Sequence, residues 1–196
     1  MGKKSSKGKK SGKGKKPDAG KKSDTNDPRP YRPCVGIMLF NAAGDVFVGN
    51  RVDTGDDSWQ MPQGGIDRGE SARDAALREL KEEVGIDKVQ ILAKTSRWLD
   101  YDLPEDLSRR IWKGRYRGQT QRWFAMRFLG SDAEIALDNH HRESTAYQWV
   151  PIDWLVDLII PFKRLVYQQV VEEFRELARP VAGPADDKSG AGQANS

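Results

Sequence analysis

The sequence predicts an α+β fold in which α-helices pack in layers against a mixed β-sheet. Three observations lead to this prediction. Short runs rich in Val, Ile and Phe are typical of strands, and two longer stretches repeat their apolar residues at the helical period. The two kinds of segment do not alternate strictly, which argues against a doubly wound parallel sheet.

The first predicted elements form a β-hairpin. Residues 34–40 are a continuous apolar run, residues 41–44 are typical of a turn, and residues 45–52 return as a second strand. Their content of Val, Ile, Phe, Tyr and Trp predicts further strands at residues 88–96, 121–129 and 147–152.

Two helices are expected. Residues 71–84 place small or aliphatic residues four apart, begin with a Ser-x-x-Asp sequence that resembles a capping box, and are followed by Gly85, a residue suited to end a helix. Residues 162–177 form the second amphipathic helix. Its predicted inner stripe consists of Leu165, Val166, Val170 and Phe174.

Both ends of the chain differ in composition from the middle. Residues 1–30 carry eleven basic and three acidic groups, a net charge of +8, and no Val, Ile, Leu or aromatic residue. Such a segment buries too little apolar surface to offset its ordering entropy, so we expect it to be disordered. Residues 180–196 are expected to form a second flexible tail. One globular domain is therefore predicted at residues 31–179, with 22 basic and 26 acidic groups outside the N-terminal tail.

Composition also excludes several classes of protein. Cys34 is the single cysteine, which rules out an intrachain disulfide framework and a multi-cysteine zinc site. No apolar run approaches the roughly 18 residues of a membrane span, and no apolar segment follows the basic N-terminus as in a secretory signal. We therefore expect a cytoplasmic protein with no membrane partner. We also expect a monomer.

Three carboxylates on the first helix are the candidate chemistry. Glu79, Glu82 and Glu83 fall within one arc of roughly 100° on a helix, beside its apolar stripe. Like charges at that spacing repel, more strongly where water is excluded. A hard divalent cation, Mg²⁺ or Mn²⁺, would offset the repulsion. The alternative is an ordinary solvated acidic face paired with neighbouring basic residues.

The segment before this helix favours the metal interpretation. Residues 62–70 contain three glycines, which allow tight turns and close approach of the backbone to a ligand. Glu70 opens the helix, where its carboxylate suits the helix dipole.

Residues 64–86 match the pattern Gly-x5-Glu-x7-Arg-Glu-aliphatic-x-Glu-Glu-x-Gly-aliphatic at every fixed position. This stretch resembles the Nudix box. The resemblance implies the Nudix fold, a mixed sheet sandwiched between helices, and Mg²⁺-dependent hydrolysis of nucleoside diphosphate derivatives, with more than one ion. It also implies a role for each matched residue: Glu79, Glu82 and Glu83 hold metal, Arg78 orients them, Glu70 supports the loop and helix, and Gly64 and Gly85 are structural positions of the box.

Motifs outside the box narrow the resemblance to one Nudix subfamily. The sequences at residues 31–33, 58–65, 119–124 and 162–164 are similar to those of bacterial RNA pyrophosphohydrolases, also described as dinucleoside polyphosphate hydrolases. By this resemblance, Arg51 and Phe162 would sandwich a base near an RNA 5′ end, and Tyr101 and Lys163 would line the cleft. Arg32 would neutralise phosphate and Trp59 would offer a further stacking face. The alternatives are core packing for each aromatic residue and plain surface charge for each basic one. Three other aromatic residues, Trp123, Trp149 and Trp154, are expected in the core.

Glu143 is a further candidate for the metal site. It lies upstream of residues 147–150, where the subfamily places an additional metal-binding or base glutamate, but Ser144 and Thr145 follow it in place of the expected Phe-Asp. The alternative is a solvated acid in a loop.

The predicted function is therefore Mg²⁺-dependent conversion of 5′-triphosphate or diphosphate RNA ends to 5′-monophosphate, which would promote RNA decay. One alternative is hydrolysis of diadenosine polyphosphates by the same site. Another is a non-catalytic RNA- or ribosome-binding protein. The basic tail of residues 1–30 is either an electrostatic arm for RNA or the ribosome, or a solubilising extension.

Overall fold

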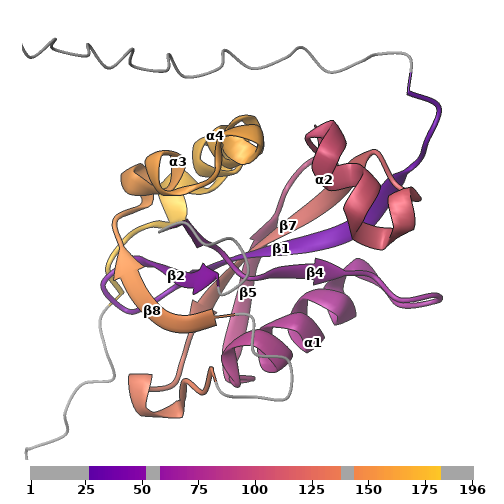
Figure 1. The fold of residues 1–196 in the computed structure, drawn as a ribbon. Helices are drawn as coiled ribbons and strands as arrows, with labels where there is room; N and C mark the ends of the chain where they lie inside the picture. The colour runs from indigo at the N-terminus through magenta and orange to yellow at the C-terminus, as the bar shows by residue number, and fades with distance from the viewer. Residues whose placement is uncertain (1–26, 52–57, 138–143, 182–196) are drawn as a thin grey trace, which may run out of the picture.

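A mixed eight-stranded β-sheet is the centre of the computed structural model, which describes residues 27–51, 58–137 and 144–181 (Figure 1). Its main strand order is β3-β2-β1-β7-β5, with β4 pairing β1, β6 pairing β7 and β8 pairing β2. The strands span Tyr31–Phe40 (β1), Val46–Arg51 (β2), Trp59–Gln60 (β3), Gln63–Gly65 (β4), Val89–Lys94 (β5), Leu99–Asp102 (β6), Gly118–Phe128 (β7) and Ser144–Val150 (β8).

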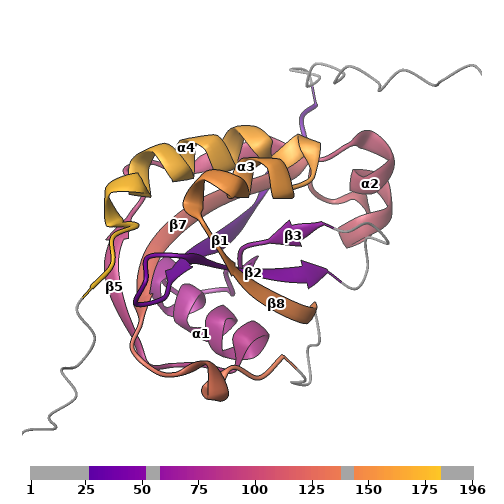
Figure 2. The ribbon, with the colours of Figure 1, turned by 90° about the vertical axis from the view of Figure 1, so that its left-hand side faces the viewer.

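Helices cover both faces of this sheet, as Figure 2 shows, with α1 on one side and α3 and α4 on the other. The α-helices span Ala72–Val84 (α1), Glu105–Arg110 (α2), Leu155–Leu158 (α3) and Arg164–Phe174 (α4). Short 3-10 turns occupy Ile111–Gly114, Asp132–Glu134, Ile152–Trp154, Pro161–Lys163 and Arg175–Leu177. The predicted α+β class and the sandwich of a mixed sheet between helices are confirmed.

The two long strands at the centre divide the core into two layers. β1 and β7 run parallel over ten residue pairs, from Tyr31 beside Gly118 to Phe40 beside Arg127, while the other strand pairs are antiparallel. Because side chains alternate across a strand, β1 and β7 supply apolar residues to both faces. One core layer packs under α1 and the other packs under α3 and α4.

The hairpin predicted at the start of the domain is present. Residues 41–44 form the turn between β1 and β2, with Gly44 at φ +92° and its N–H donating to the Asn41 carbonyl at 3.1 Å. A positive φ is a conformation that glycine adopts without steric cost. The predicted strands at residues 88–96, 121–129 and 147–152 correspond to β5, β7 and β8, with ends shifted by up to three residues.

Two details of side-chain packing differ from prediction. Leu165, assigned to the inner stripe of the last helix, is 72% exposed, and the buried positions of α4 are Val166, Tyr167, Val170, Val171 and Phe174. The stripe is therefore centred one position further along the helix. Trp154, expected in the core, is 59% exposed, because its short 3-10 turn buries Ile152 instead.

Several expectations fall on residues outside the described ones. They include most of the two tails, Glu143 and the side chain of Arg51. Within the described ranges, no helix has both the length and the apolar character that crossing a membrane demands.

Candidate functional site

The first helix carries most of the candidate site, and local signals fix both of its ends. The Ser71 hydroxyl accepts a hydrogen bond from the Asp74 N–H at 3.2 Å and donates to the Asp74 carboxylate at 2.7 Å. Gly85 ends the helix at φ +81°, with its N–H donating to the Lys81 carbonyl at 3.1 Å. The stretch from residue 72 to residue 84 is thus set as one rigid helix before any ligand binds.

Arg78 is the centre of the polar contacts on this helix. Its Nη1 donates to the carboxylates of Glu79, at 2.9 Å, and Glu82, at 3.0 Å. Its Nε and Nη2 donate to both oxygens of Glu70 at 2.9 Å, and Nη2 also donates to the Gly65 carbonyl at 2.8 Å. These contacts engage every N–H of the guanidinium, so one cation holds three carboxylates and the loop together.

The bidentate contact of Glu70 joins the glycine-rich loop to α1. The hydrogen bonds from Arg78 hold the pKa of the Glu70 carboxyl at about 2, well below its ordinary value of 4.5, and the Asp67 N–H lowers this pKa further through a 3.0 Å bond. The same contact raises the pKa of the Arg78 guanidinium. Both groups are therefore charged throughout the physiological range.

The absence of a side chain at Gly64 leaves room for the Glu79 carboxylate. A β-carbon at residue 64 would lie 1.8 Å from the carboxylate carbon of Glu79, so only glycine leaves room for that side chain against β4. Glu79 is largely shielded, with 13% of its side chain exposed, whereas the Glu82 side chain is 40% exposed. The two carboxylates of this pair thus differ in their access to water.

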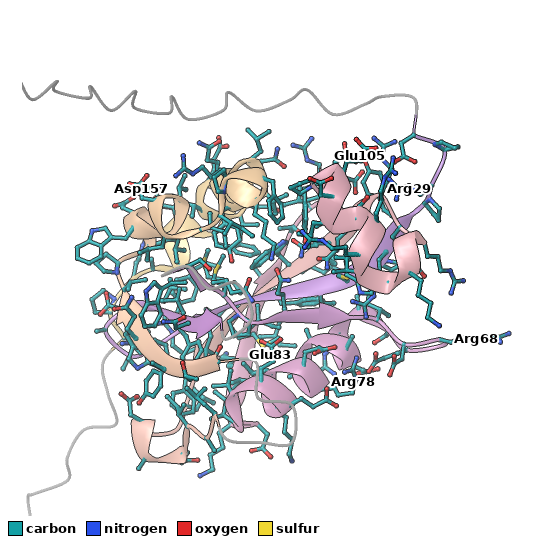
Figure 3. The ribbon with its side chains drawn as sticks, viewed as in Figure 1. Arg29, Arg68, Arg78, Glu83, Glu105 and Asp157 are labelled. Carbon is teal, nitrogen blue, oxygen red and sulfur yellow. The ribbon has the colours of Figure 1, made fainter. Side chains whose placement is uncertain are left out.

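Glu83 lies one turn beyond Glu79 and faces the start of β4, where its Oε2 accepts the Gln63 N–H at 3.3 Å. Figure 3 shows Glu83 and Arg78 on α1, while Arg68 extends outward from the preceding loop. Among the described residues, no three His, Cys, Asp or Glu side chains are grouped closely enough to hold a metal ion. Arg78 lies between two of the predicted ligands instead, at hydrogen-bond distance from each.

A second group of predicted residues meets on the opposite face of the sheet. Lys163 is 5% exposed, and its ammonium donates to the side-chain oxygens of Gln60, at 3.2 Å, and Gln63, at 3.0 Å. It lies 5.7 Å from the ring centre of Tyr101, whose ring is 5.8 Å from that of Phe162. Tyr101 is 7% exposed, so most of its stacking face is covered by these neighbours.

Buried amides continue from Lys163 along β7. Gln121 Nε2 donates to Gln119 at 2.8 Å and to Gln63 at 3.3 Å, and its Oε1 accepts the Trp123 indole N–H at 3.0 Å. Gln63 therefore touches both groups of residues, through its backbone N–H to Glu83 and through its side chain to Lys163. The amide network connects the carboxylates of α1 to Lys163 on the other face of the sheet.

The remaining predicted binding residues are Arg32, Trp59 and Arg51. The Arg32 guanidinium stacks 5.1 Å from the Trp112 ring, and a β-carbon at Gly65 would lie 2.1 Å from it. Trp59 is partly buried in β3 and packs against the core layer below α4. Arg51 ends β2, where it pairs with Ser144.

Sequence reasoning missed the amide network and Trp112. Gln60 and Gln63 lie in the motif of residues 58–65, on which the resemblance to the subfamily rests. That motif is the signal that could have indicated a role for these two glutamines. Cys34 of β1 is 1% exposed, and burial raises the pKa of its thiol to about 11. A protonated, enclosed thiol is not a nucleophile at neutral pH.

The chemistry of the candidate ligands Glu79, Glu82 and Glu83 fits a hard divalent cation, although their carboxylates do not meet at one point in this structure. All the candidate ligands are carboxylates, the oxygen donors that Mg²⁺ and Mn²⁺ prefer. The Arg78 guanidinium supplies one positive charge against the three carboxylates that it contacts. The carboxylates can therefore balance the charge of a bound metal ion, which would not be buried unpaired.

The α+β fold, the glycine-rich loop and the carboxylates of α1 together define the class of hydrolase that the motif of residues 64–86 indicates. Comparison with known proteins agrees. The family described as the NUDIX domain matches residues 30–170. The chain belongs to the Nudix family of hydrolases, which act on phosphate anhydride bonds.

Relatives and solved structures extend this comparison. An RNA pyrophosphohydrolase of Rhodospirillum rubrum is 55% identical over 151 residues, covering 77% of this chain and 91% of the relative. One of Dinoroseobacter shibae is 53% identical over 149 residues, covering 75% of this chain and 93% of the relative. The fold is similar to that of the dihydroneopterin triphosphate pyrophosphohydrolase of E. coli, with TM-score 0.56 and 24% identity over 74% of this chain and 99% of that one.

Proposed function

We propose that this protein is an RNA 5′-pyrophosphohydrolase. It adds water across a phosphate anhydride at the 5′-triphosphate or diphosphate end of RNA, releases pyrophosphate or phosphate, and leaves a 5′-monophosphate that enters RNA decay. The observation that carries the proposal is the identity of 53% and 55% with relatives of that name over three-quarters of the chain. The buried ammonium of Lys163 and the rings of Tyr101 and Phe162 support it, because they suit the phosphates and bases of an RNA end.

The residues of α1 would hold the metal in this reaction. We assign Glu79, Glu82 and Glu83 as ligands of Mg²⁺ or Mn²⁺, with more than one ion bound. Such ions, when bound, neutralise the charge of the anhydride and lower the pKa of a coordinated water. Arg78 orients the carboxylates through its hydrogen bonds, and Glu70 keeps Arg78 and the loop in place. Glu143 is proposed as a further ligand or proton acceptor.

The nucleotide end of the substrate would bind at the residues around Lys163. Lys163 presents its ammonium beside Tyr101 and Phe162, and the two glutamine oxygens orient it. Phe162 stacks on a base that Arg51 covers from the other side, while Trp59 and Arg32 extend the binding surface. Because Gln63 touches both Glu83 and Lys163, it links the position of the phosphates to that of the base. We place the enzyme in the cytoplasm as a monomer.

A paired-substrate assay tests the proposal. Purified protein with Mg²⁺ is given 5′-triphosphorylated RNA and, separately, diadenosine tetraphosphate. We expect a clear preference for RNA in kcat/KM, loss of turnover with EDTA and its return with added Mg²⁺. A strong preference for the dinucleotide would refute the RNA substrate and favour diadenosine polyphosphate hydrolysis.

Glu83→Gln separates an enzyme from a non-catalytic RNA-binding protein. Loss of a charged metal ligand should lower kcat by at least about 100-fold while RNA affinity remains. Glu172→Gln, on the exposed face of α4, is the matched control and should keep full turnover. Unchanged turnover in Glu83→Gln with intact RNA binding would contradict the assigned catalytic site.

A further inference from the structure

A cavity of about 520 Å³ opens beside the N-terminal end of α1, and the proposed catalytic site does not use it. Its floor is apolar, formed by Ile91 and Ala93 of β5 and Phe124 of β7. Its rim is formed by Ser71, Ala72, Arg73, Lys94, Trp98 and Arg122. A hollow of this size accommodates a planar ring together with an attached charged group.

The rim carries a single sign of charge. Arg73, Lys94 and Arg122 contribute three cations, and no lining residue is acidic. Arg73 pairs with Asp74 at 3.7 Å, but both side chains are about two-thirds exposed, so water screens this pair. Excess positive charge over an apolar floor favours an anionic ligand.

Trp98 supplies the second feature of the cavity. It is 43% exposed, and the Arg122 guanidinium lies 5.9 Å from its ring centre. A partly exposed indole beside a cation is a stacking surface for a flat ring. A nucleotide carries such a ring and a phosphate on the same sugar.

The cavity is distinct from the catalytic cleft. Phe124 and Arg122 alternate along β7 with Gln121 and Trp123, which face the core layer or the amide network below α4. The cavity therefore lies on the α1 face of the sheet, next to β5 at its edge, whereas Lys163 and Tyr101 lie on the other face. The catalytic loop of residues 64–70 leads directly into Ser71 at the rim.

We propose that this cavity binds a nucleotide of the single-stranded RNA substrate downstream of its 5′ end. A base stacks on Trp98, and the adjoining phosphate lies among Arg73, Lys94 and Arg122. The inference rests on the proposed RNA substrate and extends it to a second binding site outside the catalytic cleft. The RNA chain passes from the carboxylates of α1 around the glycine-rich loop to the helix start.

The test compares two double variants of the full chain. Trp98→Ala with Lys94→Gln removes the stacking ring and one cation of the cavity. Trp154→Ala with Arg175→Gln removes an exposed tryptophan and one positive charge on the side of α3 and α4, and serves as the matched control. Fluorescence anisotropy measures the binding of a labelled 12-nucleotide single-stranded RNA with a 5′-hydroxyl, which has no anhydride to cut.

We expect the cavity variant to bind the 12-mer about five- to tenfold more weakly, as removal of one stacked base predicts. Its slope of log affinity against log salt should fall by about 0.7, because the variant neutralises one phosphate fewer on a single strand. The control variant should stay within twofold. We take a 5′-triphosphorylated trinucleotide to stop short of the cavity, so its turnover should be unchanged in both variants.

Two results would overturn the inference. One is an affinity of the cavity variant for the 12-mer that equals that of the unmodified protein or of the control. The other is binding of adenosine 5′-monophosphate as tight as that of the 12-mer and abolished with Trp98, which would make the cavity a site for free nucleotides. Absence of turnover in the unmodified protein would refute the proposed function alone, since the 12-mer measurement does not depend on cleavage.

Discussion

At Gly64 the lack of a side chain decides where the Glu79 carboxylate lies. A methyl group at this position would reach within 1.8 Å of the carboxylate carbon. Since that carboxylate is the flexible end of its side chain, it can swing away at small energetic cost, but it then leaves its place beside Arg78. Catalysis should therefore suffer more than folding.

For Gly64→Ala we expect kcat on triphosphorylated RNA to fall about 100-fold, the effect of a displacement of roughly 1 Å at a reacting centre. The free energy of unfolding in urea should change by less than about 1 kcal/mol. Gly69→Ala provides the opposite case, because its β-carbon would meet open space while its φ of +85° strains any other residue. That variant should lose about 1 kcal/mol of stability. Full activity in Gly64→Ala would show that Glu79 need not hold its observed position.

The roles of single residues in the candidate site could be predicted only in part from the sequence. The Nudix-box residues were found because each has a fixed position in one continuous motif. The hydrogen bond from Gln121 to Gln63 depends on the register of β7, β1 and β4, which no local pattern encodes. A glutamine in a strand is usually a surface residue, so burial of this amide network could be learned only from the fold.

Among the elements, the loop of residues 65–70 and α1 behave as one unit because Glu70 and Arg78 join them. Both partners are mostly shielded, with 16% and 28% of their side chains exposed. A carboxyl group whose pKa is lowered by folding binds fewer protons in the native state, so the stability it contributes is lost on acidification. The pKa of Glu70, about 2 against an ordinary 4.5, sets the range in which this happens.

Glu70→Gln should therefore destabilise the protein by about 1–2 kcal/mol above pH 4.5, with allowance for partial exposure of the pair. The difference from the unmodified protein should shrink as the pH falls from 4.5 toward 2, because Glu70 then becomes protonated in the native state as well. Urea denaturation at several pH values measures this difference. A difference that stayed constant with pH would mean that Glu70 acts by packing and not by its charge.

Elements with signals inside their own sequence were predicted well. The first helix has a cap residue, apolar residues four apart and Gly85 at its end, and the structure places it at Ala72–Val84. The strands β3 and β4 have two and three residues, too few for any periodicity, and exist because they pair with β2 and β1. The helix α2 has no side-chain cap, so its start at Glu105 was not predicted.

On the scale of the whole molecule, charge is distributed unevenly. The basic tail of residues 1–30 has a net charge of +8, while the rest of the chain has four more acidic than basic groups. If the tail is an electrostatic arm for RNA, deletion of residues 1–30 should weaken RNA binding and reduce its dependence on salt, by about 0.7 in slope for each phosphate that the tail neutralises. Titrations at several salt concentrations test this. An unchanged slope would leave the tail as a solubilising extension.

Arg127 joins three distant parts of the fold. It is 5% exposed on β7, and its guanidinium donates to the carbonyls of Asn41 in the first hairpin and of Leu177 and Arg179 after α4. Burial lowers the pKa of this arginine. Carbonyl dipoles from the first hairpin and from the segment after α4 therefore stabilise a cation that is costly to bury.

Arg127→Met should remove these hydrogen bonds and lower the free energy of unfolding by about 2–4 kcal/mol. The segment around Val181 should open more easily than the rest of the fold. The Val181 N–H donates to the Ala42 carbonyl at 2.9 Å, between the same two segments that Arg127 joins. Hydrogen exchange should therefore accelerate more at Val181 than at Leu80 in the middle of α1. Arg127→Lys keeps the charge but offers a single nitrogen to three carbonyls, so it should recover only part of the stability. Equal acceleration at both amides would mean that Arg127 supports the core as a whole and not the junction between the first hairpin and the segment after α4.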